Sequence, residues 1–537
     1  MEPATLWFVL VLLVPLFLWL GLGNRDLWAP DEPRYALVAQ EMIQHGSYVV
    51  PTVNGEVYAH KPPLFFWFIA LFSKITGVPA SSGFIARLPS ALSALLTLFL
   101  TGLIAREFFD RRVTTYAIAI LATSHMFCWQ AHAAQIDSLL TALIVLSIFC
   151  GVRYTTTGKE SYRYGFFLAA SLATLAKGPV GILIPFGAIA IWRWRTQDRE
   201  RALFTVEGFA VLLAPLVFWL VLATLLSGTV YVEEIIGRHV VKRYLKSWHH
   251  IQPWYYYLHN IPENMMPWGL FIPAALVTAI RAPKTGSTQR GLELVLCWFF
   301  FMLAFFSATK GKRGLYMLPA APALAILIAW ALDGLDRSTD EAGKNLAYLG
   351  FAILPSVTLA AALLLPDYIY AKTGGAQAIV APLTLAMLFA SIALIVGWKG
   401  DRIRKLTQAL LMAIIPIYLG LYGLFLPSLN PHKSVRKLAE HAAFLAGPNK
   451  NLGFYGDLLE GYVLYAARHI THAETPSELA RQVASKGPMV TIMQIEKLEE
   501  LREDSSMKIE ILEEHRLGSK NMILAMVSPG VNQAQPE

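Results

Sequence analysis

The sequence is poor in charged residues and in cysteine for its length. Only 15% of its 537 residues are charged and 55% are hydrophobic, which gives a mean hydropathy of +0.48. Ordinary soluble domains carry roughly 25% charged residues. The three cysteines all fall inside apolar segments, so neither a disulfide framework nor a cysteine metal site is expected. These shortages favour a polytopic membrane protein.

The N-terminus lacks a basic leader region and a small-residue cleavage site. Its apolar run, residues 6–22, is about as long as a helix needs to cross a bilayer. We therefore expect a retained helix and not a cleaved signal peptide. The net charge of +8 does not indicate nucleic-acid binding, because loop charge that sets membrane orientation explains it first.

Apolar segments recur along most of the chain and predict about 13 membrane-spanning helices. We place them at 5–23, 84–104, 113–131, 136–152, 164–177, 179–192, 203–226, 267–280, 292–308, 315–332, 346–365, 378–397 and 408–426. Every second connection carries two to four Lys or Arg residues, which predicts that these connections face the cytoplasm. The outer side then holds two long connections, 24–83 and 227–266, and the tail.

One short outer connection departs from this charge pattern. The segment "SATKGKRGLYMLP" carries Lys310, Lys312 and Arg313. Either one span is miscounted, or these cations bind an anionic group at the outer membrane surface.

The tail, residues 429–537, is mixed in composition and predicts a small soluble α/β domain beside the membrane domain of residues 1–428. "KNLGFYGD" and "GPMVTIMQ" are typical of strands. "TPSELARQVASKG" predicts a helix with an N-cap Thr, an early Pro and a final Gly. The tail shows no catalytic motif.

The first outer connection holds an unusual acid pair in "LWAPDEPRYALVAQEM". Asp31 before Glu32 and Pro33 suits the N-cap of a helix. Apolar residues at helical spacing then predict an amphipathic helix along the membrane surface. Asp31 therefore either caps this helix or serves a site.

Further ionisable residues gather on the same predicted side of the membrane, at the ends of the spans and in the outer connections. They are Tyr58, His60, Lys61, Arg87, Asp137, Lys177, Arg238, His239, Lys242, Arg243 and Tyr244. Such residues are costly at a membrane unless they are paired or functional. Clustered cations beside aromatic residues suit an anionic lipid headgroup such as a phosphate, and carboxylates among them suit sugar binding or base catalysis.

Several motifs, taken in order, resemble a known family. "LWAPDEPRYALVAQEM", "HKPPLFFW", "ARLPSALSALL", "ATLAKGPVG" and "KRGLYMLPAAPALAI" look like the polyprenyl-phosphate-sugar-dependent glycosyltransferases of the GT-C fold. The resemblance is strongest to the bacterial lipid A aminoarabinose transferases, which are related to protein O-mannosyltransferases, and it covers roughly residues 5 to 430.

The resemblance implies about 13 helices, interfacial helices in the first outer loop and a periplasmic C-terminal domain, in a bacterial inner-membrane protein that acts as a monomer. It implies an undecaprenyl-phosphate-linked sugar donor and a lipid A or other glycolipid acceptor. It also implies roles for individual residues. Asp31 and Asp137 would be catalytic; Tyr58, Lys61, Arg243, Tyr316, Lys177 and Arg87 would hold or support the donor phosphate; Glu32, His60, Arg238, His239, Lys310 and Arg313 are further candidates.

One position departs from the family pattern. Family members commonly read Tyr-x-Glu-Lys-Pro-Pro, whereas this chain reads "YAHKPP". His60 stands where relatives have a metal-binding acid, so a divalent metal would be absent or held by His60 with His239. We predict no metal.

The reaction so implied is an inverting sugar transfer at the periplasmic face, with cations stabilising the leaving phosphate. A hydroxyl acceptor on a protein or another glycolipid remains an alternative, and it would need a base more than a phosphate acceptor does. A transporter of lipid-linked sugars would show internal repeats and polar residues at mid-membrane, and we find no convincing repeat. The third hypothesis, a scaffolding membrane protein, is the least favoured, because it does not explain why the acids and cations gather on one side of the membrane.

Overall fold

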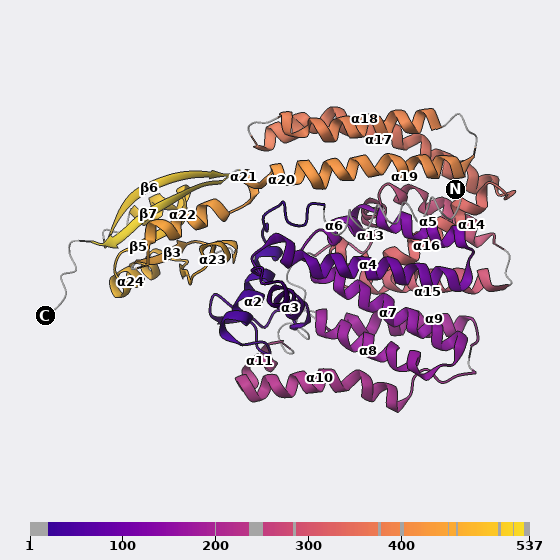
Figure 1. Ribbon diagram of the computed structural model, residues 1–537, viewed down its shortest axis with the longest axis horizontal. Coiled ribbons are helices and arrows are strands. Elements are labelled where there is room, and N and C mark those ends of the chain that lie inside the picture. The colour runs from indigo at the N-terminus through magenta and orange to yellow at the C-terminus, as the bar shows by residue number, and fades with distance from the viewer. Residues whose placement is uncertain are drawn as a thin grey trace.

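The computed structural model describes residues 20–198, 200–235, 251–282, 286–373, 377–397, 402–448, 450–457, 460–502, 506–518 and 520–530. The predicted first span, 5–23, lies almost entirely outside the described residues, as do Arg238, His239, Lys242, Arg243 and Tyr244. Figure 1 shows helices running side by side as a bundle, with a sheet beyond one end and α2 and α3 at that same end.

The bundle contains helices long and apolar enough to cross a membrane. Seven such segments occur among the described residues: α4 (Gly83–Phe108), α7 (Ile136–Thr157), α10 (Val206–Ser227), α15 (Gly286–Ala308), η3 with α16 (Gly314–Leu335), part of α17 (Glu341–Thr373), and α19 with its continuation (Ile403–Ser428). The shorter helices of the bundle are α5 (Arg111–Ala122), α6 (His125–Ala131), α8 (Glu160–Lys177), α9 (Val180–Arg195), α14 (Ile272–Ile280) and α18 (Gln377–Gly397). The protein is thus a polytopic helical membrane protein, and the count of 13 spans stays a prediction.

Polar residues inside α4 show how the bundle packs. Ser93, Thr97 and Thr101 are buried, and each hydroxyl donates to the carbonyl one turn earlier, at 2.6–2.8 Å. The side chains are therefore satisfied within their own helix. Small residues of this kind let neighbouring helices approach closely in a membrane.

The segment predicted as one helix, 113–131, is two helices. The break comes at Thr123 and Ser124, whose hydroxyls donate to the carbonyls of Ala119 and Ile120 at 2.6 and 2.7 Å. The indole Nε1–H of Trp268 donates to the Thr123 hydroxyl at 2.8 Å and fixes the turn. Two hydroxyl residues in succession thus divert the chain where apolar composition alone predicted continuity.

The first outer connection forms α2 (Asp31–His45), a short hairpin of β1 (Thr52–Val53) and β2 (Glu56–Val57), and α3 (Leu64–Thr76). The predicted capping role of Asp31 is wrong: the N-cap position is Pro30, and no side chain caps the helix. The helix ends at Gly46, whose φ of 71° is the left-handed conformation that glycine adopts without strain. Nor does α2 present only one buried face, since Ala36 and Leu37 are as buried as Val38.

The tail forms the predicted α/β unit. Its sheet has the order β4-β3-β5-β7-β6; β3 is parallel to β4 and β5, while β5–β7 and β7–β6 are antiparallel. The strands are β3 (Asn451–Tyr455), β4 (Thr471–Ala473), β5 (Met489–Gln494), β6 (Met507–Leu517) and β7 (Lys520–Pro529). The helices are α21 (Asn430–Lys433), α22 (Arg436–Ala446), α23 (Glu460–Ala466), α24 (Pro476–Lys486) and α25 (Leu498–Arg502). Thr475 caps α24 as predicted, accepting from the Glu478 N–H at 3.3 Å.

Alternate residues of the strands serve two cores, one on each face of the sheet. Leu452 and Phe454 pack with α22 and α23, whereas Tyr455 and Met489 pack with α24 and α25. The first core also includes Leu27, Ala36, Leu37, Ala86 and Ala134. The C-terminal unit therefore docks on the first outer connection, and this covers the second face of α2.

Candidate active site

Glu32 is the centre of a buried ionic cluster. Its carboxylate accepts hydrogen bonds from Arg25 at 2.9 and 3.1 Å and from Arg87 at 2.7 and 3.0 Å. The backbone N–H groups of Trp28 and Ala134 add two more, at 3.1 and 3.0 Å. Burial by itself opposes ionisation, but the charges of Arg87 and Arg25 outweigh it and lower the pKa of Glu32 to about 2.

Arg87 is fully buried, and its remaining donors also hold the loop. They bond the carbonyls of Leu22, Arg25 and Asp26, each at 2.7 Å. The sequence placed Arg87 among the residues that hold or support the donor phosphate and Glu32 among the further candidates. Here both are occupied with each other and with the backbone. These bonds fix the path of the chain that leads into α2.

Asp31, the neighbour of Glu32, faces the other way. One carboxylate oxygen accepts from the Gln135 amide at 3.2 Å, and the other lies 3.5 Å from the Arg34 guanidinium. Its side chain is 14% exposed. No hydrogen bond from a backbone N–H group of α2 to this carboxylate is found among the described residues.

Arg34 joins Asp31 to the C-terminal unit. Its Nε–H donates to Glu460 of α23 at 2.5 Å, and its charge acts on the phenol of Tyr58. Burial, partly offset by the charge of Arg34, raises the pKa of Tyr58 well above its ordinary value and keeps the phenol protonated. Tyr58 also stacks on His60, with ring centroids 5.0 Å apart.

Asp137 lies in the first turn of α7 and pairs with Lys177, the last residue of α8. The Lys177 ammonium in turn lies 5.1 Å from the centre of the Tyr316 ring, a cation–π distance. Three segments predicted to share one side of the membrane thus meet here. A costly intramembrane carboxylate is compensated, as its position requires.

The two acid groups adjoin each other. Gln135, which bonds Asp31, stands two residues before Asp137 in the chain. Tyr35 is buried, and its pKa is raised by that burial and then by the negative charges of Asp31 and Asp137. The structure therefore brings Asp31, Tyr58, Asp137, Lys177 and Tyr316 into one region.

The loop that carries the three anomalous cations is built against this region. Lys312 is buried and bonds the carbonyls of Gln252 and Thr309, so it holds the loop. Gly314 packs closely on Asn260, since a Cβ there would lie 2.6 Å from the Asn260 amide oxygen and would displace that side chain. Lys310 is exposed and Arg313 is half-buried, so these two cations are accessible to an anion.

The remaining predicted residues are placed less fully. Lys61 is half-buried just before α3, and His60 is exposed beside it. Arg243, Arg238 and His239 lie outside the described residues. Among the described residues no group of three metal-ligating side chains includes His60. Because His239 lies outside them, the pairing of His60 with His239 stays a prediction.

Four residues of the site escaped sequence reasoning: Arg34, Tyr35, Gln135 and Glu460. Arg34 carried a signal, since it stands three residues after Asp31 on one helix and opposite charges at that spacing pair. Glu460 carried none, because its contact spans 426 residues of sequence.

The chain was compared with known proteins. Residues 60–221 match the family model described as dolichyl-phosphate-mannose-protein mannosyltransferase. The chain is 30% identical, over 67% of its length and 66% of the relative, to an undecaprenyl phosphate-alpha-4-amino-4-deoxy-L-arabinose arabinosyl transferase of Pseudomonas paraeruginosa. It is also 30% identical to an uncharacterised protein of Aquifex aeolicus, over 66% of this chain and 69% of that one. The chain thus spans about two thirds of the length of these relatives.

A solved structure shares the fold over the whole chain. ArnT from Cupriavidus metallidurans bound to undecaprenyl phosphate matches with a TM-score of 0.79 at 20% identity, covering 100% of both chains. An oligosaccharyltransferase of Archaeoglobus fulgidus matches at a TM-score of 0.52 and 11% identity, over 92% of this chain and 70% of the other. At these identities the similarity shows the fold alone, which is the GT-C fold that the motifs implied.

Proposed function

This chain belongs to the polyprenyl-phosphate-sugar-dependent membrane glycosyltransferases of the GT-C fold, and we propose that it transfers an amino sugar from undecaprenyl phosphate to lipid A. The sugar we propose is 4-amino-4-deoxy-L-arabinose, the group named in the Pseudomonas relative. The site would lie at the periplasmic face of the bacterial inner membrane, with the 429–537 unit on the same side, as the basic connections predict.

The observation that carries the proposal is the placement of Asp31. A carboxylate with no capping role is held at the start of α2 by Arg34 and Gln135, beside the Asp137–Lys177–Tyr316 group. This arrangement offers an acid to a sugar or its acceptor and cations to a phosphate. Protonated phenols such as Tyr58 and Tyr35 supply further hydrogen-bond donors.

In the proposed reaction an acceptor oxygen attacks the anomeric carbon of the sugar. The bond from that carbon to the phosphate oxygen breaks, and its electron pair leaves with undecaprenyl phosphate. The negative charge that develops on the leaving phosphate needs cations, for which we propose Lys61, Arg243, Lys310 and Arg313. Lys177 would act through Asp137, and Tyr316 would fix Lys177 in place.

The role of Asp31 depends on the acceptor. A lipid A phosphate is already anionic and brings no proton to remove, so Asp31 would hold the sugar hydroxyls or the sugar's ammonium group. With a hydroxyl acceptor, Asp31 would take the proton as general base. We keep a hydroxyl acceptor as the alternative, because the matched family model is described as a protein mannosyltransferase.

The test is transfer by the purified full chain, with undecaprenyl-phosphate-aminoarabinose as donor and lipid A as acceptor, followed by mass spectrometry. With this acceptor Asp31 would bind the sugar, so we expect Asp31→Asn to lower the rate by about 10- to 100-fold, the loss of one hydrogen bond to a charged group. The size-exclusion elution profile of the variant should match that of the wild type. Glu56→Gln is the matched control, because Glu56 is an exposed acid of the same outer connection. Full activity of Asp31→Asn would remove Asp31 from the mechanism, and unmodified lipid A with the wild type would refute the acceptor.

A further inference from the structure

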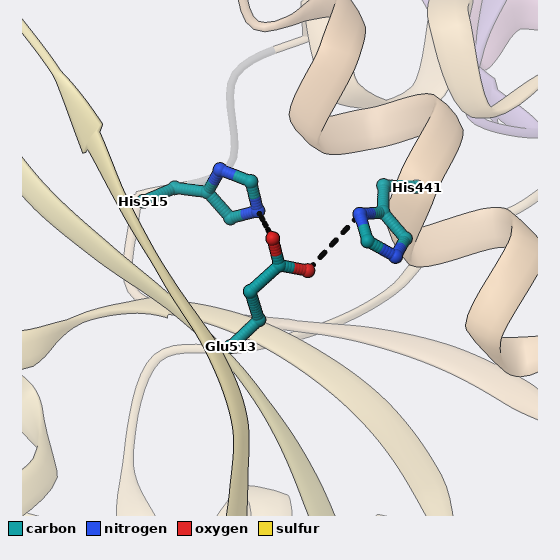
Figure 2. Close-up of side chains that lie close together, drawn as sticks. All are labelled: His441, Glu513 and His515. Carbon is teal, nitrogen blue, oxygen red and sulfur yellow. Dashed lines mark ion pairs between the residues drawn. The ribbon is translucent and has the colours of Figure 1, made fainter.

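A second cluster of ligating side chains lies in the C-terminal unit, on a different element from Glu460. His441 of α22 and His515 of β6 both face Glu513 of β6 (Figure 2). The His441 Nδ1 atom lies 3.0 Å from one oxygen of Glu513, and the His515 Nε2 atom lies 2.9 Å from the other. Among the described residues this is the one group of three such side chains whose ligand atoms all lie within 4.8 Å of one another.

The strand geometry explains why two of these residues meet. Glu513 and His515 are two positions apart, so a strand presents both on the same face. The register between β6 and β7 shifts between Ile511 and Glu513, where a bulge inserts one residue into β6. Bulges re-aim side chains and are frequent beside functional sites. Here the residues beyond the bulge face α22, which brings His441.

The chemistry of the three groups suits a metal better than an ion pair alone. Two imidazoles and one carboxylate are the protein ligands of many zinc sites that keep a fourth position open for water. The imidazole rings lie 6.1 Å apart at 81°, so their nitrogens approach the carboxylate from different directions. The His515 Nε2 atom is buried and makes no hydrogen bond of acceptable geometry to any described residue. A metal ion would satisfy that nitrogen.

The site is also reachable from solvent. The side chains of His441, Glu513 and His515 are 38%, 35% and 30% exposed. An ion could therefore enter without unfolding the unit. Zinc binds nitrogen and oxygen ligands at ~2.0–2.2 Å, and small shifts of the three side chains would place their ligand atoms at that distance from a shared ion.

We propose that His441, Glu513 and His515 bind one divalent transition-metal ion of the zinc class, with water as the fourth ligand. The ion ties α22 to β6, which is the edge strand of the sheet. The cluster contains none of the residues of the Asp31 site. The proposal is independent of the glycosyl transfer, and its test measures metal binding directly.

The experiment uses the full chain, purified in detergent without a polyhistidine tag and stripped with a chelator. Zinc is titrated with a competing chromophoric chelator, and Co²⁺ is added separately to record visible absorption. We expect one zinc per chain and Co²⁺ bands typical of tetrahedral coordination. Because even partners outside the ligand set change metal affinity 10- to 100-fold, loss of a ligand in His441→Ala, His515→Ala or Glu513→Gln should weaken binding at least about 100-fold.

His469→Ala is the matched control, since His469 is an exposed histidine of the same unit outside the cluster. Glu513→Gln keeps the shape of the side chain and guards against a folding defect, which size-exclusion chromatography would reveal. Zinc bound equally by Glu513→Gln and the wild type would show an adventitious ion only and overturn the proposal. So would a wild type that binds no zinc at micromolar concentration.

Discussion

Asp31 and Glu32 are neighbours in sequence, yet they lie in opposite surroundings. Glu32 is 4% exposed and takes six hydrogen bonds from two arginines and two backbone groups. Asp31 is held at longer range by one amide and one guanidinium. The carboxylate oxygens of Glu32 are fully used by hydrogen bonds within the protein. Those of Asp31 can accept further hydrogen bonds, so Asp31 can bind a ligand. The difference separates a positioning cluster from a candidate site.

The largest expected effect tests the positioning cluster. Arg87→Met leaves Glu32 with one arginine fewer in a dry environment, and breaking a buried pair costs about 3–5 kcal/mol. Arg34→Met removes a cation whose side chain is 26% exposed, and pairs of that kind contribute about 0.2–1 kcal/mol. Thermal unfolding in detergent should therefore show a much lower midpoint for Arg87→Met. Equal unfolding midpoints for Arg87→Met and Arg34→Met would contradict the distinction between a buried positioning cluster around Glu32 and a weakly held acid at Asp31.

The second largest effect is the loss of stability at low pH, when Glu32 is protonated. The pKa of Glu32 is about 2 in the folded protein against 4.5 unfolded, so its stabilising contribution is full above pH 4.5 and fades as pH falls toward 2. At neutral pH that shift corresponds to roughly 3 kcal/mol. Glu32→Gln, which resembles the protonated acid, should lie below the wild type at pH 7, and the gap should narrow between pH 4.5 and 3. A gap that stays constant with pH would show that Glu32 is not ionised in the fold.

The smallest effect concerns the link between Asp31 and the C-terminal unit. Arg34 pairs with both Asp31 and Glu460, and Glu460→Gln removes the charge of the second acid. The side chains of Arg34 and Glu460 are 26% and 20% exposed. We expect a loss of no more than about 1 kcal/mol in stability and a change of no more than about fivefold in the rate of sugar transfer. Glu474→Gln, an exposed acid of the same unit, serves as control. A loss as large as that of Asp31→Asn would move Glu460 into the reaction itself.

Much of the fold could be read from composition and periodicity. Most described helices of the bundle overlap their predicted ranges, because long apolar runs leave the chain few other structures in a membrane. The predicted span 346–365 is shorter than the helix found there, Glu341–Thr373. The strands and the capped helix of the tail also follow local signals. The break at Thr123 was missed, since it depends on hydroxyl groups that an apolar average hides.

The candidate site was less predictable, for reasons of distance in the chain. Motifs marked Asp31, Tyr58, Asp137, Lys177 and Tyr316 as belonging to one side of the membrane, but not which of them touch. Local rules made Asp31 a helix cap, and cis-linked Pro30 holds the cap position instead. The burial of Arg87 and Glu32 depends on contacts 55 residues apart, which no local window contains.

The sequence by itself determined a polytopic helical protein, because hydropathy acts locally along the chain. Its loop charge predicts that the acids, cations and phenols lie on the outer side of the membrane. Only the tertiary structure decided how the two adjacent acids divide their roles. The docking of α23 on α2 brings Glu460 to Arg34, and the packing of α4 brings Arg87 to Glu32. Burial and pairing set what a carboxylate can do, and both arise from segments that meet only when the chain folds.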